Sequence, residues 1–150
     1  MIELNNPQHA EVIAKVAGIV RNPTTDACIS RSHDDKLLGG VIYKDYTGFS
    51  CSMHVAGFAT YWINRDMLWV CFDYPFNQLK CGKLFGPTSA DNIQALEFNQ
   101  KIGFKLDTII RDVFPTGDMH LLSMYREECR WLKLKPRTIQ AGDSDDGWQE

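Results

Sequence analysis

His54 is the side chain in this sequence best suited to acid–base chemistry, because the ordinary pKa of histidine, about 6.5, lies close to neutral pH. It stands near the end of a β-rich stretch, residues 49–56. His54 is therefore either a catalytic base or a partly buried strand residue with a satisfied hydrogen bond. Cys51 in the same stretch offers a thiol nucleophile, although buried cysteines are usually inert. Glu97 offers a carboxylate, and its place in a predicted helix favours a solvated surface charge.

The cysteines do not suggest a metal site. There are five of them, an odd number, and none has the short paired spacing that zinc ligands show. We expect free thiols and no bound metal ion. The five residues are Cys28, Cys51, Cys71, Cys81 and Cys129.

The elements that position these groups are clearest in residues 88–104. Ser89 and Asp91 can each cap the first turn of a helix, because a short side-chain oxygen accepts a hydrogen bond from an unpaired backbone N–H. Gly103 can end that helix in the left-handed conformation, and Phe104 begins an extended run. The pattern predicts a helix over residues 91–101 that is followed directly by a strand.

The whole chain reads as an α/β protein with a mixed central sheet. Short turns between the first three strands predict an antiparallel meander, and the strand–helix–strand order of residues 49–114 predicts parallel pairing in the middle of the sheet. The expected helices are residues 7–20, 65–80 (kinked at Pro75) and 91–101. The expected strands are residues 27–32, 37–44, 49–56, 81–87, 105–114 and 119–129, with the alternating charges of 126–131 on a solvated edge.

Two features of this layout leave alternatives open. The pair Gly39-Gly40 marks either a β-bulge or a close backbone approach. The irregular residues 57–64 carry three aromatic side chains that either line a ligand pocket or cover an edge of the core: Phe58, Tyr61 and Trp62.

Length and charge limit the classes of function. At 150 residues and 17.1 kDa the chain suits one domain, expected over residues 1–135, with an acidic and disordered tail over 136–150. A net charge of −3 argues against nucleic acid as a main partner. No apolar run reaches the roughly 18 residues of a membrane span, and the N-terminus lacks the pattern of a secretory signal. We expect a cytoplasmic protein.

Residues 88–104 also carry a more particular pattern than a capped helix. Asn92 is followed by Ala95, then by the aromatic Phe98, and then by Lys-x-Gly-Phe at 101–104. This pattern resembles the coenzyme-A-contacting helix of the GCN5-related N-acetyltransferase (GNAT) superfamily. The order of elements agrees with the GNAT layout, except that the family's usual second helix is at most a loop around residues 21–26.

Three shorter segments extend the resemblance to one branch of the superfamily. Residues 73–76, 117–118 and 125–127 look like the variants related to ribosomal-protein acetyltransferases, and short phage-encoded members share this character. The resemblance covers roughly residues 5–132, and only residues 88–104 are specific.

The resemblance implies acetyl-CoA as cosubstrate, held where residues 49–56 and 81–87 splay apart. The pantetheine arm is expected to pair with the strand near Met53, Val55 and Ala56. The diphosphate is expected at the N-terminus of the next helix, where unpaired N–H groups favour anions. The family commonly places a base near His54. The remaining contacts that it implies are Asn64 and Arg65 at the diphosphate, Asn92 beside the pantetheine, Asn99 on the same helix, and Lys101 toward the nucleotide.

Two positions depart from the family pattern. The phosphate loop is normally Gln or Arg, two residues, Gly, one residue, then Gly or Ala, whereas residues 61–66 here read YWINRD. Either the affinity for coenzyme is reduced, or Arg65 compensates with a charge-assisted contact. Many members also have a Tyr that protonates the leaving thiolate where this chain has Asn99. Because Asn is no acid, that role is unfilled or passes to solvent.

We therefore expect an N-acetyltransferase that moves an acetyl group directly from acetyl-CoA to an amine. A protein N-terminus or lysine is the favoured acceptor, and a polyamine is less favoured because no acidic acceptor groove is evident in the sequence. One alternative is a GNAT-fold module that binds acyl-CoA or a protein partner without turnover. Another is a nucleic-acid-modifying protein, against which the acidic pI of about 5.8 argues. A homodimer is left open.

Overall fold

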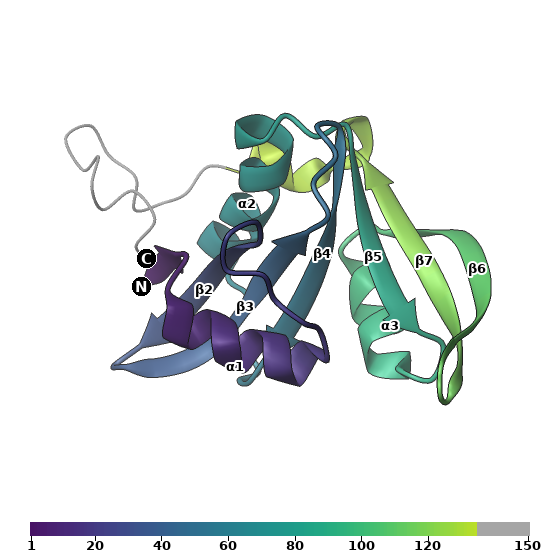
Figure 1. The fold of residues 1–150 in the computed structure, drawn as a ribbon. Coiled ribbons are helices and arrows are strands. Elements are labelled where there is room, and N and C mark those ends of the chain that lie inside the picture. Colours follow the sequence, from purple (N-terminus) through teal and green to yellow (C-terminus); the bar gives the residue numbers. More distant parts are fainter. Residues whose placement is uncertain (135–150) are drawn as a thin grey trace.

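A seven-stranded mixed sheet forms the centre of the molecule, in the strand order β1-β2-β3-β4-β5-β7-β6 (Figure 1). The computed structural model describes residues 1–134. The strands are β1 (Ile2–Leu4), β2 (Ala27–His33), β3 (Lys36–Lys44), β4 (Ser50–Gly57), β5 (Lys83–Ser89), β6 (Lys105–Phe114) and β7 (Gly117–Tyr125). The helices are α1 (Pro7–Ala17), α2 (Arg65–Asp73) and α3 (Ile93–Lys101). This arrangement confirms the α/β fold with an antiparallel N-terminal meander.

All neighbouring strands pair antiparallel except β4 and β5, which pair in parallel. That parallel pair is short, because it runs only from Ser50 opposite Lys83 to Ser52 opposite Phe85. Both strands continue beyond these residues without pairing to each other, and they diverge in Figure 1. The predicted splayed strands in the middle of the sheet are therefore present.

The helices cover the two faces of the sheet unequally. α1 lies in front of β2–β4 in Figure 1, where Ala10 and Ile13 pack with Ile42 and Ala56. The larger core lies on the opposite face, under α2 and α3, and includes Phe72 and Phe104 with tilted rings 6.4 Å apart. We name these the α1 face and the α2/α3 face of the sheet.

Helix ends follow local capping rules, with two differences from the sequence expectation. α1 ends at Ala17 and not at residue 20, because Gly18 takes the left-handed conformation at φ 73°. α3 begins at Ile93, since the side chain of Asn92 accepts the Ala95 N–H, so neither Ser89 nor Asp91 is the cap. Gly103 follows α3 with φ 113°, as the sequence predicts.

The kink expected at Pro75 is a change of helix type. α2 ends at Asp73 and continues as one π-helical turn, Tyr74–Gln78. Pro75 has no N–H to donate to the carbonyl of Cys71, and that carbonyl accepts from the hydroxyl of Tyr43 at 2.6 Å instead. Leu79 N donates to Tyr74 O, five residues back, at 2.9 Å, which is the π-helical pattern. The helix is therefore wider in the turn that contains Pro75.

The C-terminal part of the described chain differs most from the prediction. The last strand ends at Tyr125, and short 3₁₀ turns follow at Arg126–Glu128 and Arg130–Lys133. The expectation of a strand to residue 129 is wrong, whereas the charged residues Arg126, Glu127, Glu128 and Arg130 are exposed, as expected. Arg126 donates to the carbonyl of Phe76 and Arg130 to that of Lys101, so both side chains tie the chain back onto the helices.

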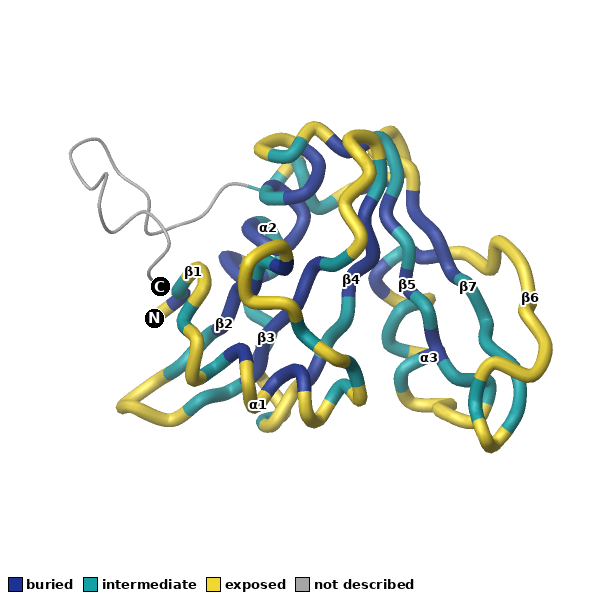
Figure 2. Tube along the Cα trace, in the orientation of Figure 1, coloured by how far each residue is buried: buried dark blue, intermediate teal, exposed yellow. Residues whose placement is uncertain are grey.

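Two further differences concern the edges of the sheet. β1 is a three-residue edge strand that pairs with β2, and the sequence analysis does not predict it. β6 forms the other edge and is exposed along almost its whole length, whereas β2–β4 are largely buried (Figure 2). None of the helices in residues 1–134 is long and apolar enough to cross a membrane. The proposed tail, residues 136–150, lies outside the described residues.

Candidate active site

The point where β4 and β5 part is the centre of the candidate site. No residue of β4 after Ser52 pairs with β5, so one backbone edge of β4 from Met53 to Gly57 faces the divergence and not a neighbouring strand. An extended ligand can add to such an edge with main-chain hydrogen bonds, as an additional strand does.

The side chains of β4 alternate between the two faces of the sheet. Met53 and Val55 lie on the α2/α3 face, where Met53 is 5% exposed in the larger core. Ser52, His54 and Ala56 lie on the α1 face, and Ala56 is also buried. Of the three β4 residues predicted to bind coenzyme (Met53, Val55 and Ala56), two have buried side chains. They can offer a ligand their backbone groups only.

His54 is held by a short hydrogen-bonded chain on the α1 face. Ser52 Oγ donates to the carbonyl of Lys44 at 3.3 Å and lies 3.0 Å from His54 Nε2. A hydroxyl has one proton, so the Ser52 oxygen accepts the remaining hydrogen bond from Nε2–H. This arrangement leaves Nδ1 of the neutral imidazole with the free lone pair, which is the form a base requires.

Burial lowers the pKa of His54, and the nearby Lys44 ammonium lowers it further. The carboxylates of Asp45 and Asp26 act in the opposite direction but do not reverse the shift. His54 is therefore neutral at pH 7 and able to accept a proton.

A polar hollow of about 460 Å³ lies beside this histidine. Within it Lys44 Nζ lies 2.5 Å from Asp26 Oδ2, while Asp45 is exposed. Two carboxylates and one ammonium give the hollow a net negative charge. The sequence alone shows no acidic groove, because the lining comes from two segments that are far apart in the chain, one before β2 and one at the end of β3: Asn22, Thr25, Asp26, Lys44, Asp45 and Tyr46.

The connection from β4 to α2 brings Asn64 and Arg65 to the end of the splayed strand. Asn64 Oδ1 accepts the Met67 N–H at 2.8 Å and caps α2. Arg65 is exposed at the first helical position, whereas Asp66 beside it is 4% exposed. An anion at this helix end would meet one cation, one buried carboxylate and the helix dipole.

Trp62, in the same connection, is buried against the sheet and is 7% exposed. Its indole lies over Gly39 so closely that a Cβ there would lie 2.6 Å from Trp62 Cδ2, and Gly57 is equally crowded. Ile13 crowds Gly40 from the other face. The glycine pair therefore marks close approaches, next to an irregular register between Arg31 and Ser32.

α3 places its three candidate residues at different points of the site. Asn92 is exposed at the N-terminal end, and its amide Nδ2 is the group left for a ligand, since Oδ1 caps the helix. Asn99 donates from Nδ2 to Thr88 Oγ1 at 3.1 Å and so joins α3 to β5. Lys101 is exposed at the opposite end of α3, where its carbonyl accepts from Arg130.

The other candidate groups have structural surroundings. Cys51 is 2% exposed with its Sγ 3.9 Å from Cys81 Sγ, and burial raises the pKa of its thiol far above the ordinary range. Such a thiol is a poor nucleophile. Glu97 is exposed on α3. All five cysteines are free, as expected, and no group of three metal-ligating side chains occurs within residues 1–134.

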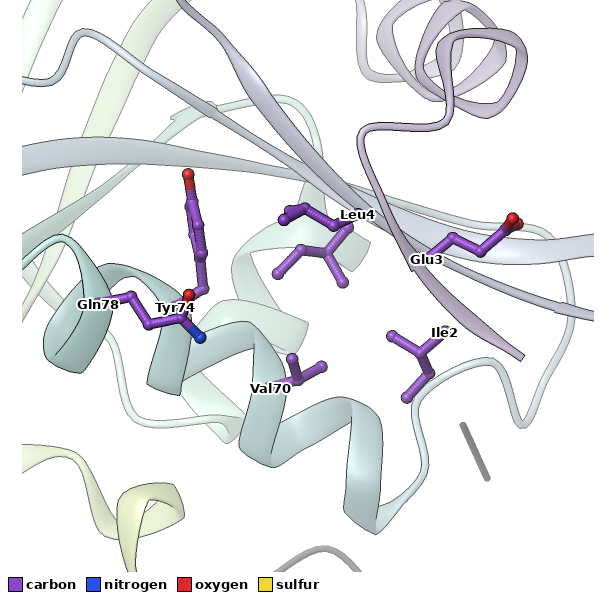
Figure 3. A pocket seen from close by; sticks show the side chains of 7 residues that line it. Ile2, Glu3, Leu4, Val70, Tyr74 and Gln78 are labelled. Atoms are coloured by element: carbon purple, nitrogen blue, oxygen red, sulfur yellow. The ribbon is translucent and has the colours of Figure 1, made fainter. Parts of the chain in front are cut away.

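A second, apolar pocket lies between β1 and α2 (Figure 3). Its volume is about 20 Å³, enough for about one water molecule. Ile2 and Val70 point into it, and Tyr74 borders it. The pocket holds no charged group except Glu3, which points away, so it adds nothing to the chemistry near β4.

Ser52, Lys44 and Asp26 are the site residues that sequence reasoning missed. The spacing of Ser52 and His54 by two residues on a predicted strand was an available signal, because such residues share a face. No comparable signal joins Asp26 to Lys44, which are 18 residues apart.

No protein-family model and no curated protein sequence matches the chain. Solved structures are similar to it in fold. The spermidine/spermine N-acetyltransferase SpeG from Vibrio cholerae matches with a TM-score of 0.64 at 12% identity, over 83% of this chain and 91% of that one. The N-acetyltransferase PseH from Campylobacter jejuni, in complex with acetyl coenzyme A, matches at 0.59 and 18%, over 84% and 99%. A GNAT-family acetyltransferase from Bacillus anthracis matches at 0.58 and 12%, over 83% and 87%.

The chain has the GNAT fold. At these identities the likeness concerns the fold alone, so the fit of coenzyme A must be judged from this chain's own residues. The free edge of β4 fits a pantetheine arm, and the start of α2 offers backbone N–H groups and Arg65 to a diphosphate. The residues present fit the coenzyme. Trp62 lies in the connection between the β4 edge and the start of α2.

Proposed function

We propose that this protein is an N-acetyltransferase that uses acetyl-CoA and transfers the acetyl group directly to an amine. The observation that carries the proposal is the parting of β4 and β5 after Ser52 and Phe85, with His54 two residues beyond it. The fold shared with known N-acetyltransferases supports the same conclusion.

The protein's contribution to the reaction is to position the substrates and to manage a proton. When bound, the coenzyme supplies an activated acetyl thioester. The backbone of β4 from Met53 to Gly57 would bind the pantetheine arm, with Asn64, Arg65 and Asn92 as further contacts. His54 Nδ1 would take the proton that the acceptor ammonium must lose before its nitrogen can attack. Asn99 donates to Thr88 and provides no acid, so the departing thiolate would take its proton from solvent.

The acceptor would approach from the α1 face, where His54 and the polar hollow lie together. A lysine or a protein N-terminus, as the ribosomal-protein-like segments suggest, would bring one ammonium to Asp45. A polyamine would bring several, and the net negative charge of the hollow makes it a second acceptor to test. SpeG, which shares the fold, is a spermidine/spermine N-acetyltransferase.

One alternative has an observation in its favour. The buried position of Trp62 beside the β4 edge, together with the missing phosphate-loop glycines, would suit a module that binds acyl-CoA or a protein partner without turnover. Such a module would bind coenzyme A but release no thiol in the presence of any amine.

The test begins with calorimetric titration of the full chain with acetyl-CoA. We expect saturable binding, and an absence of binding at millimolar acetyl-CoA would rule out the enzyme. Thiol release is then followed with spermidine, with free lysine and with peptides that have a free or a blocked N-terminus. Turnover with any of these amines supports the transferase, and binding without turnover across the set supports the module.

A further inference from the structure

Trp62 lies across the route by which a ligand would run from the β4 edge to the start of α2. The route begins at Met53–Gly57 and ends at Asn64 and Arg65, and Trp62 belongs to the short connection between them. Its side chain is on the α2/α3 face, over Gly57, and its ring stacks on Phe98 of α3 with centroids 6.1 Å apart. The contact between the two rings therefore connects the end of β4 to α3.

The residues around the Trp62 indole leave space for it and hold its backbone in place. Gly39 and Gly57 are paired across β3 and β4, and both lack the Cβ that would collide with the ring. Arg31 Nη1 donates to the carbonyls of Tyr61 and Trp62, at 2.5 and 3.0 Å, and holds the backbone of the connection against the sheet. The buried position of Trp62 thus depends on four separate parts of the chain.

The connection that carries Trp62 is separate from the regular elements on either side of it. Residues 58–64 belong to no helix or strand, and Tyr61 within them is 84% exposed. α2 has its own cap in the hydrogen bond from Met67 N to Asn64 Oδ1, which does not involve Trp62. Movement of the indole away from Phe98 would therefore leave α2 and its N-terminal N–H groups in place.

We propose that Trp62 and Phe98 form an aromatic cover over the route from the β4 edge to the start of α2 and that this cover must part before coenzyme A binds. The inference rests on the proposed function, because it assigns this route to coenzyme A. When only a fraction of the molecules is open, the apparent dissociation constant is the intrinsic one divided by that fraction. Weakening the cover should consequently tighten and accelerate binding, which general damage to the fold would not do.

The experiment compares coenzyme A binding to the wild-type chain, Phe98→Ala and Ile102→Val. Ile102 is buried at the end of the same helix but has no part in the ring pair, so its variant controls for loosening of α3. Dissociation constants come from calorimetry and association rates from stopped-flow tryptophan fluorescence. We expect Phe98→Ala to bind coenzyme A roughly 2- to 10-fold more tightly, the range that loss of one aromatic contact allows. We also expect its limiting association rate to rise by a similar factor, with Ile102→Val unchanged.

Each outcome decides the inference. Equal or weaker binding by Phe98→Ala while the wild type binds would overturn the cover and leave the proposed function intact. An equal gain in Ile102→Val would also overturn it, since the effect would then be general loosening. If neither protein binds coenzyme A, the proposed function fails and the inference falls with it. Phe98→Leu, which keeps most of the side-chain volume but removes the ring, replaces Phe98→Ala if the latter does not fold.

Discussion

The two faces of β4 differ in what they can do, although their residues alternate along one strand. On the α1 face, Ser52 and His54 form a hydrogen-bonded pair beside a hollow that contains Asp26 and Lys44. On the α2/α3 face, Met53 packs in the larger core, and the Trp62–Phe98 contact lies at the end of the strand. The first face is polar and titratable, whereas the second is apolar and close-packed.

This difference follows from the period of two in a strand, which sends neighbouring residues to opposite environments. Under the proposed function, this alternation would bring the base and the coenzyme to one backbone edge from opposite sides. The consequence is a separation of effects: a change on the α1 face should alter chemistry with little loss of stability, and a change on the other face should do the reverse.

The largest expected effect comes from removing the base on the α1 face. His54→Gln keeps a donor for Ser52 Oγ but loses the group that accepts a proton, so kcat/KM should fall by about 10²- to 10⁴-fold. Thiol release with the identified amine gives the rate, and thermal unfolding should show little change. His33→Gln, at the exposed end of β2, is the control and should keep full activity. Full activity in His54→Gln would mean that the α1 face does not supply the base.

The next effect concerns the close-packed face. Gly39→Ala should lower the free energy of unfolding by about 1–3 kcal/mol, because its Cβ would lie 2.6 Å from the rigid Trp62 ring. Urea unfolding measures the loss. Gly86→Ala is the matched control on β5, since its Cβ would meet Phe104 at an ordinary 3.5 Å. We expect the control to be neutral or stabilising by up to about 1 kcal/mol. Equal losses at both positions would refute the close packing of Trp62.

The features that the sequence predicts are those set by neighbours along the chain. Asn64 and Gly103 act on the helix turn beside them, and both are placed as the capping rules predict. The parallel pairing of β4 and β5 is predicted from the helix between them, because parallel strands need a crossover connection and a helix usually provides it. These local rules are sufficient to predict an α/β fold with a mixed sheet, whereas the GNAT layout is implied by the resemblance of residues 88–104.

The features that the sequence does not predict depend on contacts between distant residues. Trp62 covers Gly39, 23 positions earlier, and either partner alone has several ordinary explanations. Arg126 and Arg130 look like solvated strand charges until the carbonyls they bind are known. The acidic hollow is also formed by residues distant in the sequence, since Asp26 precedes β2 and Lys44 ends β3. Predicting the chemistry of the site therefore requires the three-dimensional structure, whereas the fold can be predicted largely from the sequence.

A smaller effect on stability is expected at the hollow itself. Burial tends to raise the pKa of Asp26, but the Asn22 N–H and the Lys44 ammonium outweigh it and hold the pKa below its usual value. The ionised carboxylate therefore stabilises the fold above the unfolded pKa, near ~3.9, and this contribution is lost as pH falls through the folded pKa. Asp26→Asn should cost roughly 1 kcal/mol at pH 7 and nothing at the acid limit. Urea unfolding of both proteins from about pH 2 to pH 7 measures the difference, and a difference that stays constant over this range would contradict the ion pair.

The smallest effect tests how the three charges of the hollow shift the pKa of His54. Burial lowers the pKa of His54 first, and the Lys44 ammonium lowers it further. Lys44→Met removes the cation and leaves Asp26 and Asp45, which both favour the protonated imidazole, so the pKa of His54 should rise. A higher pKa means that the base is lost earlier as pH falls, and the acid limb of the kcat/KM profile should move upward. The C2 proton of His54, titrated by NMR, reports the same shift without any assay of activity. Lys36→Met, at the exposed start of β3, should leave both profiles unchanged. An unchanged or lowered pKa in Lys44→Met would show that burial alone sets the state of His54, and the hollow would then have no part in preparing the base.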